Sequence, residues 1–202
     1  MLAINRRAVL CWAMSFETQY LGGQILIATP AMLDPRFARS IIMMCLHDDD
    51  GAMGVVLNNP QPRVNLGEIL KQSGVEGPNA ARPRPVFNGG PVGRERGFVL
   101  HSDDFFSLES SIRVRDGLVL TSTKDVLLAL AGESPPERAI FALGYAGWSP
   151  GQLEAELGVN AWLIAEGTDA LIYDTKPEKM WEAALAQIGI KPSQLSMFSG
   201  SA

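Results

Sequence analysis

Cysteine, histidine and long apolar runs are scarce in this sequence, and each scarcity argues against a class of protein. Two cysteines and two histidines stand among 202 residues, and Cys11 and Cys45 have neither Cys-x-x-Cys nor metal-ligand spacing. No stretch approaches the roughly 20 apolar residues that a membrane-spanning helix needs. The sequence therefore predicts no disulfide scaffold, no Cys/His zinc site and no membrane protein, and two free thiols are typical of the reducing cytoplasm.

An excess of basic charge is also missing. Lysine and arginine number 17 against 22 aspartates and glutamates, which gives a net charge of −5 and a pI near 5.1. Proteins that bind duplex DNA draw on a basic face that neutralises phosphates. The acidic balance therefore argues against direct nucleic-acid binding. An apolar content of 47% is that of an ordinary globular protein.

The common catalytic motifs are absent as well. The sequence has no Walker loop, no Gly-x-Gly-x-x-Gly, no His-Glu-x-x-His and no Gly-x-Ser-x-Gly. We therefore predict no catalytic residue, no metal ligand and no cofactor. The sequence favours a non-catalytic protein without settling whether it is an enzyme.

Turn residues between apolar runs indicate an α+β fold with a largely antiparallel sheet. Asp50-Gly51 between residues 40–46 and 52–57, and Asp116-Gly117 between 112–114 and 118–121, are hairpin signals. Further strands are expected at 24–28, 85–87, 97–101, 138–145 and 161–165, and helices at 66–72, 124–131, 150–157 and 176–188. Capping boxes at Ser149 and Thr175 would open the last two helices.

Residues 16–202 are expected to form one domain. Residues 1–15 read as a poorly ordered extension, and Met14 is an alternative start to Met1.

Two segments contain a histidine beside carboxylates. The turn at residues 47–50 holds His47 and three aspartates, which could form a hard-metal site or an acid–base site, although exposed aspartates usually only solvate a turn. His101 ends an apolar strand beside Asp103 and Asp104 and could act as a general base. A histidine bonded to a backbone carbonyl at the sheet edge explains the same residues, and we favour that interpretation.

Two further segments are rich in glycine. Residues 88–92 read as a tight turn between strands, where Gly89 and Gly90 could expose N–H groups to an anion or a peptide carbonyl. Residues 144–154 lead a strand into a helix N-terminus, with Tyr145 and Trp148 on the connection. These two rings are equally well explained as a binding surface and as anchors of the core, and we expect the Trp148 indole to be partly buried.

The sequence resembles the YqgE/AlgH family, an uncharacterised bacterial family, from about residue 16 to the C-terminus. The matching segments are 21–30, 47–58, 89–92, 99–101, 144–156, 160–162 and Trp181. Gly-Tyr-Ala-Gly-Trp followed by Gly-Gln-Leu-Glu is the most specific of them. The resemblance implies a compact, flattened β-barrel-like sheet with helices packed on it, in a bacterial cytoplasm. It implies no reaction. The name AlgH is associated with transcriptional regulation, but this sequence contains no helix-turn-helix motif that would support such a role.

The best interpretation is a non-catalytic cytoplasmic binding or regulatory protein with an unknown protein or small-molecule partner. One alternative is an enzyme of unidentified class that uses His101 as acid–base with the amides of Gly89 and Gly90. Another is a transcriptional regulator that acts indirectly. The candidate binding residues are Asn58, Gly89, Gly90, Pro91, His101, Tyr145, Trp148 and Gln152. For the enzyme alternative, His101 and the glycine turn must meet in one pocket.

Overall fold

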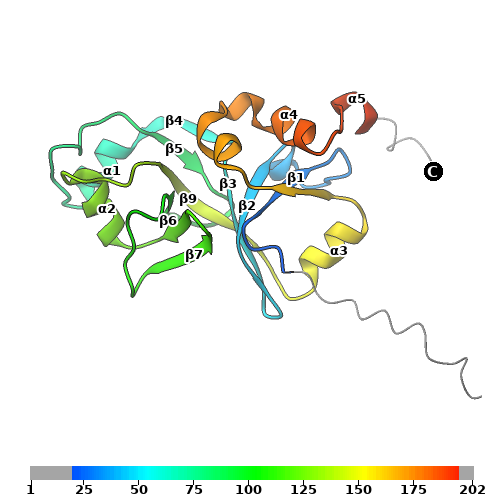
Figure 1. The fold of residues 1–202 in the computed structure, drawn as a ribbon, viewed down its shortest axis with the longest axis horizontal. Coiled ribbons are helices and arrows are strands. Elements are labelled where there is room, and N and C mark those ends of the chain that lie inside the picture. Colours follow the sequence, from blue (N-terminus) through cyan, green and yellow to red (C-terminus); the bar gives the residue numbers. More distant parts are fainter. Residues whose placement is uncertain (1–19, 196–202) are drawn as a thin grey trace, which may run out of the picture.

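A computed structural model describes residues 20–195 of the chain (Figure 1). The expected extension of residues 1–15 and the alternative start at Met14 lie outside the described residues. None of the helices within residues 20–195 combines the length and apolar character needed to cross a bilayer.

A curled sheet forms the centre of the molecule. Its strands are β1 (Gln24–Ala28), β2 (Ile41–Asp48), β3 (Gly51–Val56), β4 (Pro60–Asn65), β5 (Pro85–Asn88), β6 (Val92–His101), β7 (Ser111–Arg115), β8 (Leu118–Thr121), β9 (Ala139–Trp148) and β10 (Trp162–Glu166). They follow the order β10-β1-β2-β3-β9-β6-β8-β7, while β5 pairs with β4 and β9. Every pairing is antiparallel except β5 with β9. The expected α+β fold with a largely antiparallel sheet is confirmed.

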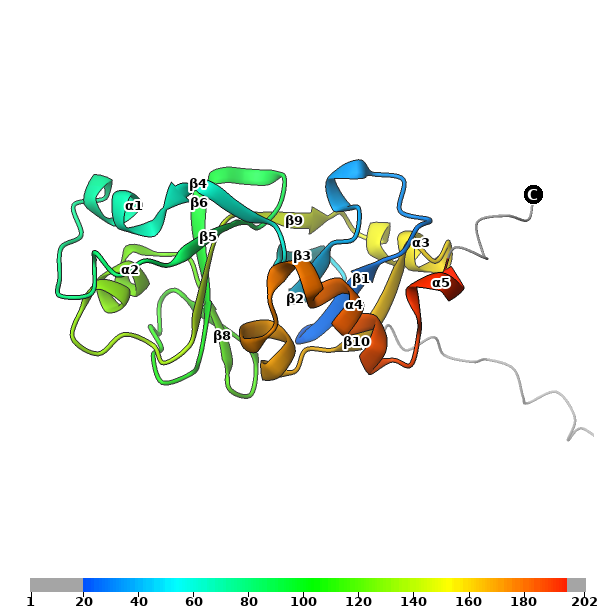
Figure 2. The ribbon, with the colours of Figure 1, turned by 90° about the horizontal axis from the view of Figure 1, so that it is seen from above.

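Short helices cover the two ends of this sheet. They are η1 (Pro35–Phe37), α1 (Leu66–Gln72), α2 (Lys124–Ala131), α3 (Gln152–Gly158), the π-helical turn η2 (Ala170–Asp174), α4 (Pro177–Gln187) and α5 (Pro192–Leu195). Figure 2 shows α1 and α2 at one end, beyond β5 and β6, and α3, α4 and α5 at the other, around β1 and β10. Helix α4 contacts β1, β2 and β10.

The spacing of apolar residues in the sequence correctly predicts the buried face of helix α4. Met180, Trp181, Ala184 and Leu185 are buried, as their spacing predicts, and the indole of Trp181 donates a hydrogen bond to the backbone oxygen of Ala28 at 2.8 Å. The predicted cap was wrong, however. The helix starts at Pro177 without a side-chain cap, because the Thr175 hydroxyl donates instead to Ala170 O, in the preceding π-helical turn.

The capping box predicted at Ser149 is only half formed. Helix α3 begins at Gln152 rather than at residue 150, and Gly151 precedes it with φ near 73°. The Gln152 side chain still accepts a hydrogen bond from the backbone N–H of Ser149 at 3.1 Å. The chain therefore makes a glycine turn between strand and helix, and only the reciprocal bond of the box remains.

Strand β9 is longer than expected and passes through the middle of the sheet. It was predicted to end at residue 145, but it continues to Trp148. Residues 141–143 of β9 pair with β5 on one edge and with β6 on the other, whereas residues 146–148 pair with β3. One continuous strand thus belongs to both halves of the molecule.

The predicted tight turn at residues 88–92 is instead a crossing. Strands β5 and β6 flank β9 on opposite edges, so the chain must pass over the β9 backbone between them. A Cβ on Gly90 would overlap the carbonyl carbon of Tyr145, and one on Gly144 would lie 2.6 Å from Gly90 O. Both positions exclude side chains because two backbones touch there, which gives the glycines of both segments an architectural role.

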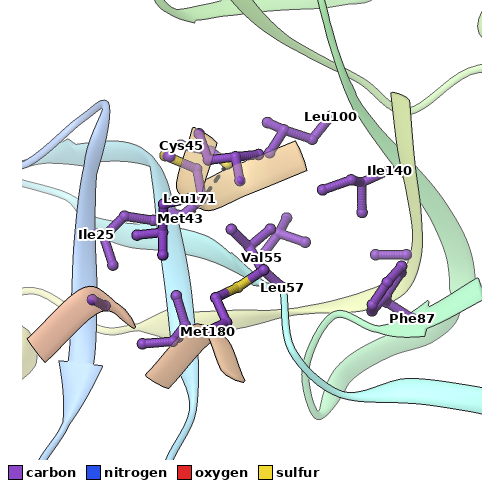
Figure 3. Close-up of a cluster of buried hydrophobic side chains, with 14 of the residues drawn as sticks. Ile25, Met43, Cys45, Val55, Leu57, Phe87, Leu100, Ile140, Leu171 and Met180 are labelled. Atoms are coloured by element: carbon purple, nitrogen blue, oxygen red, sulfur yellow. Dashed lines mark hydrogen bonds between the residues drawn. The ribbon is translucent and has the colours of Figure 1, made fainter. Parts of the chain in front are cut away.

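A single apolar cluster joins the two halves. Figure 3 shows Ile25, Met43 and Val55 from β1 to β3 facing Leu100 and Ile140 from β6 and β9. Helix α4 and the turn η2 close the cluster with Met180 and Leu171. The core therefore lies inside the curl of the sheet.

Candidate functional site

A groove with a volume of about 560 Å³ opens on the curled sheet. Six neighbouring strands line it, namely β2, β3, β9, β6, β8 and β7. Its floor contains the buried Phe98 and Leu120 and the half-buried Tyr145, whose ring meets that of Phe98 edge-on at 5.5 Å between centroids. The groove is thus the place where the apolar core reaches the surface.

Exposed apolar side chains gather around this groove. Leu46, Val92 and Ile112 are 40%, 41% and 37% exposed, and they come from three different strands. Strand β2 is buried without interruption from Ile41 to Cys45 and becomes exposed at Leu46, where a bulge shifts its register against β3. Exposed apolar residues that line one opening mark interaction sites more often than scattered single residues do.

The rim of the groove is polar and mildly acidic. Asp48, Asp50 and Arg96 provide its charges, and Ser110, Ser122 and Ser149 provide hydroxyl groups. Asp48 accepts a hydrogen bond from the backbone N–H of Asp50 at 2.9 Å, so the turn holds both residues in place. The Arg96 guanidinium lies 5.7 Å from the centroid of the Phe98 ring. Two carboxylates against one guanidinium leave the lining with a net negative charge.

His47 does not belong to a metal site in the described part of the chain, where no group of three potential ligands gathers. Its Nδ1 accepts a hydrogen bond from the Leu21 N–H at 3.1 Å, so Nε2 carries the proton and faces Glu154 Oε1 at 2.7 Å. The pKa of Glu154 is lowered by a hydrogen bond to its own backbone N–H and by His47. His47 thus ties the start of the described chain to α3.

His101 is bonded to a backbone carbonyl, which is the arrangement that the favoured interpretation expects. It is fully buried; Nδ1 donates to Ser102 O at 2.8 Å, and Nε2 accepts from the Thr121 hydroxyl at 2.9 Å. Burial lowers the pKa of His101, partly offset by the bond to Ser102 and by Asp104. His101 does not line the groove. The amide of Gly89 is engaged as well, because it donates to Leu143 O at 2.8 Å. The described pockets therefore do not bring His101 together with Gly89 and Gly90, as the enzyme alternative requires.

Trp148 is an anchor of the core. The residue is only 7% exposed, so it is more deeply buried than we expected, although it also lines the groove. The indole N–H donates to Glu156 Oε2 at 2.9 Å, and the Trp162 indole donates to the same oxygen at 2.7 Å. Gln152 donates to the other oxygen of Glu156 at 2.9 Å. This carboxylate fixes α3 against the sheet.

The remaining predicted residues divide between structure and a second cavity. The Asn58 side chain accepts from the Ile41 N–H and donates to Arg39 O, both at 2.9 Å, and so fixes the end of β3. Gly90 and Pro91 line a smaller recess of about 250 Å³. Of the predicted residues, the groove thus brings together Tyr145 and Trp148 alone. Sequence analysis missed its exposed apolar residues, since no local pattern distinguishes them from core positions of the same strands.

Comparison with known proteins agrees with the resemblance noted from the sequence. A UPF0301 protein of Beijerinckia indica is 48% identical over 190 residues, covering 91% of this chain and 93% of that protein. One from Caulobacter vibrioides is 45% identical over 187 residues, covering 92% and 96%. The solution structure of the AlgH protein from Pseudomonas aeruginosa is similar with a TM-score of 0.74 and 39% identity, covering 91% of this chain and 95% of that one.

A crystal structure of a protein from Corynebacterium diphtheriae shares the fold, with a TM-score of 0.65 and 19% identity over 87% of this chain and 91% of that one. The model of the AlgH-like family, DUF179, matches residues 25–193. The chain therefore belongs to the AlgH-like family.

Proposed function

We propose that this protein is a non-catalytic, cytoplasmic binding protein that holds an extended segment of a partner protein in the groove. The segment inserts an apolar side chain above Phe98 and Tyr145 and places a basic residue next to Asp48 and Asp50. The observation that carries the proposal is the convergence of Leu46, Val92 and Ile112 on one opening of the core. Regulation of the partner would follow from occupancy of the groove.

The shape and chemistry of the groove support a peptide occupant. Its floor is apolar and aromatic, which gives a hydrophobic anchor that binds without a specific hydrogen bond. Serine hydroxyls on the rim can bond to an extended backbone. Tyr145 stands between the two, half-buried against Phe98. Such a division between apolar floor and polar rim is typical of protein interfaces.

The charge of the rim favours a basic residue in the bound segment, next to its apolar side chain. Asp50 forms no ion pair with the other described residues, and Asp48 bonds only to the turn. The whole chain carries a net charge of −5, which adds a long-range attraction for basic partners. Arg96 is set over Phe98 and forms part of the wall. The rim thus selects a cationic segment over an anionic one.

A titration with designed peptides tests the proposal. The probes are three capped heptapeptides: one with a central leucine between arginines, one with the arginines replaced by glutamates, and one with the leucine replaced by serine. Methyl-labelled protein reports the position of binding by NMR. We expect saturable shifts at Leu46, Val92 and Ile112 with the first peptide, and at least tenfold weaker binding of the other two.

Two variants identify the groove as the binding surface. Leu46→Asp should abolish the shifts, while Ile164→Asp, at a residue 38% exposed on the edge strand β10, should leave them unchanged. Equal binding of all three peptides would overturn the proposal. So would sedimentation showing a dimer that Leu46→Asp dissociates, because a second copy would then occupy the groove.

A further inference from the structure

We propose that the recess beside the crossing of β5 over β9 is a second site, which binds the phosphoryl group of a small molecule. It is independent of the groove and of the peptide proposed there. Two adjoining recesses, of about 250 and 240 Å³, share Asn59, Asn88 and Arg94. Together they are large enough for a phosphorylated metabolite.

Backbone pairing fixes the two asparagines side by side. The Asn88 N–H donates to Asn59 O at 2.8 Å, where β4 and β5 meet, and Asn88 pairs with Leu143 of β9. The crossing comes directly after Asn88 in the sequence, and its residues Gly90 and Pro91 also line the recess. Within the described chain, no hydrogen bond involves the side-chain amides of Asn59 and Asn88. Their side-chain donors are therefore available, on a stretch of backbone that strand pairing holds in place.

An excursion of β6 brings Arg94 to the same place. Between the pairs Val92–Tyr145 and Gly97–Leu143, β6 covers five residue steps where β9 covers two. The added residues leave the ladder, and Gly144 gives the start of this excursion room, since a Cβ there would lie 2.9 Å from Val92 O. As a result Arg94 lines the recess, whereas Arg96 lines the groove. Among the described residues, Arg94 has no ion-pair partner.

The charge of the recess is opposite to that of the protein. No carboxylate stands among the described residues that line it, although acidic residues outnumber basic ones in the whole chain. Arg36 also lines it and is held by Asp34 through Nε and Nη2, with a shortest distance of 2.6 Å. That pair is neutral as a unit, and Nη1 of Arg36 is left to donate. Arg94 thus adds one uncompensated positive charge.

The number of donors favours a phosphoryl group over a carboxylate. A carboxylate has two oxygens, and the fork of Arg94 can by itself bond to both of them. A phosphoryl group has three and carries up to two negative charges near neutral pH. It can bond at once to Arg94, to Arg36 and to the amides of Asn59 and Asn88. Arginine is suited to this geometry because its planar donors match two oxygens of the anion.

Titration of the whole chain with inorganic phosphate tests the site. At pH 7.5 and constant ionic strength, ¹⁵N-detected NMR should show saturable shifts of the Arg94 Nε–H and of the side-chain amides of Asn59 and Asn88. Arg94→Ala should weaken binding at least tenfold, and Arg94→Lys should retain part of it. Arg96→Ala is the matched control on the same strand, and it should bind phosphate as the unaltered protein does.

Three results would overturn the proposal. The first is a shift that rises without saturation or survives in Arg94→Ala. The second is equal affinity for acetate, which would make the site a carboxylate site. The third is binding of a phosphoserine peptide at least tenfold more tightly than of glycerol phosphate, which would point to a phosphoprotein. Asn88→Ala provides a second variant, and its spectrum checks that the fold is intact.

Discussion

The carboxylate of Glu156 holds Trp148, a candidate binding residue in the sequence, in the interior of the protein. This carboxylate accepts hydrogen bonds from Trp148, Trp162 and Gln152, and the two indole N–H groups meet at one oxygen. The rings themselves pack edge-on at 6.0 Å between centroids. An aromatic residue that the sequence presents as a surface candidate is thus held on both its apolar and its polar side.

Replacing Trp148 with alanine should therefore cost stability. We expect a loss of about 3–5 kcal/mol in the free energy of unfolding, as for other buried large aromatics, from urea denaturation followed by circular dichroism. Trp148→Phe should cost less, since it keeps most of the apolar contact and loses the bond to Glu156. A loss below about 1 kcal/mol for the alanine variant would show that the ring is not an anchor.

The burial of His101 predicts a pH dependence of stability. Its pKa is lowered in the folded state, so below about pH 6.5 the unfolded chain binds a proton that the folded chain does not. The stabilising contribution is complete above pH 6.5 and is lost as the pH falls from there toward the folded pKa. The slope is at most about 1.4 kcal/mol per pH unit.

Comparison with a variant isolates this contribution. Urea denaturation between pH 7.5 and 5.5 should show a steeper loss of stability for the unaltered protein than for His101→Gln, which has no imidazole to titrate. The difference between the two curves removes the contribution of all other groups. Parallel curves would mean that His101 does not titrate differently in the two states.

At the scale of elements, the crossing of β5 over β9 depends on glycine. Gly90→Ala would force a Cβ into the Tyr145 carbonyl, at a φ of 153°. We expect a loss of more than about 3 kcal/mol, or no folded protein, because neither backbone can move without breaking a strand pairing. Gly151→Ala is the matched control: its φ is 73°, but nothing lies within 4 Å of the added Cβ.

The control separates conformational strain from collision. Gly151→Ala should cost about 1–2 kcal/mol, the expense of a left-handed backbone alone. Both values are measured by thermal and urea denaturation under the same conditions. Equal losses in the two variants would mean that the crossing tolerates a side chain.

Local signals predicted the elements better than their ends or their partners. The hairpins at Asp50-Gly51 and Asp116-Gly117 and the stripe of α4 were correct because neighbouring residues decide them. The starts of α3 and α4 were wrong, since the Thr175 hydroxyl bonds to the preceding turn and Gly151 takes a left-handed conformation. The parallel pairing of β5 with β9 joins residues more than 50 positions apart, which no local pattern reports.

For the whole molecule, the groove could not be derived from the sequence. It contains residues from Leu46 to Ser149, which come together only because the sheet curls. Tyr145 was found because of its unusual glycine-rich surroundings, whereas Leu46 and Ile112 look like any core residue of a strand. Candidate residues with distinctive chemistry, such as His101, turned out to be interior contacts.

The position of Cys45 in the core predicts that its thiol is protected from reagents. Cys45 is buried in the cluster that joins both halves, and burial raises its pKa to about 12. In a Cys11→Ser background, Cys45 should react with an aromatic disulfide reagent at pH 8 only through unfolding, because the reactive thiolate is scarce and covered. The rate with increasing urea should follow the global transition. Rapid reaction in native buffer would show that the two halves separate locally.

The central position of β9 has a consequence for synthesis on the ribosome. Strands β3, β5 and β6 are made before residue 102, and each has one edge that pairs with β9, which begins at Ala139. Strand β1 likewise has one edge that pairs with β10, although its other edge pairs with β2 early. At about 5–20 residues per second, the unpaired edges remain open for several seconds. The nascent chain thus carries strands with one free edge until the last third of the sequence has been made, and those edges can pair with other chains during that time.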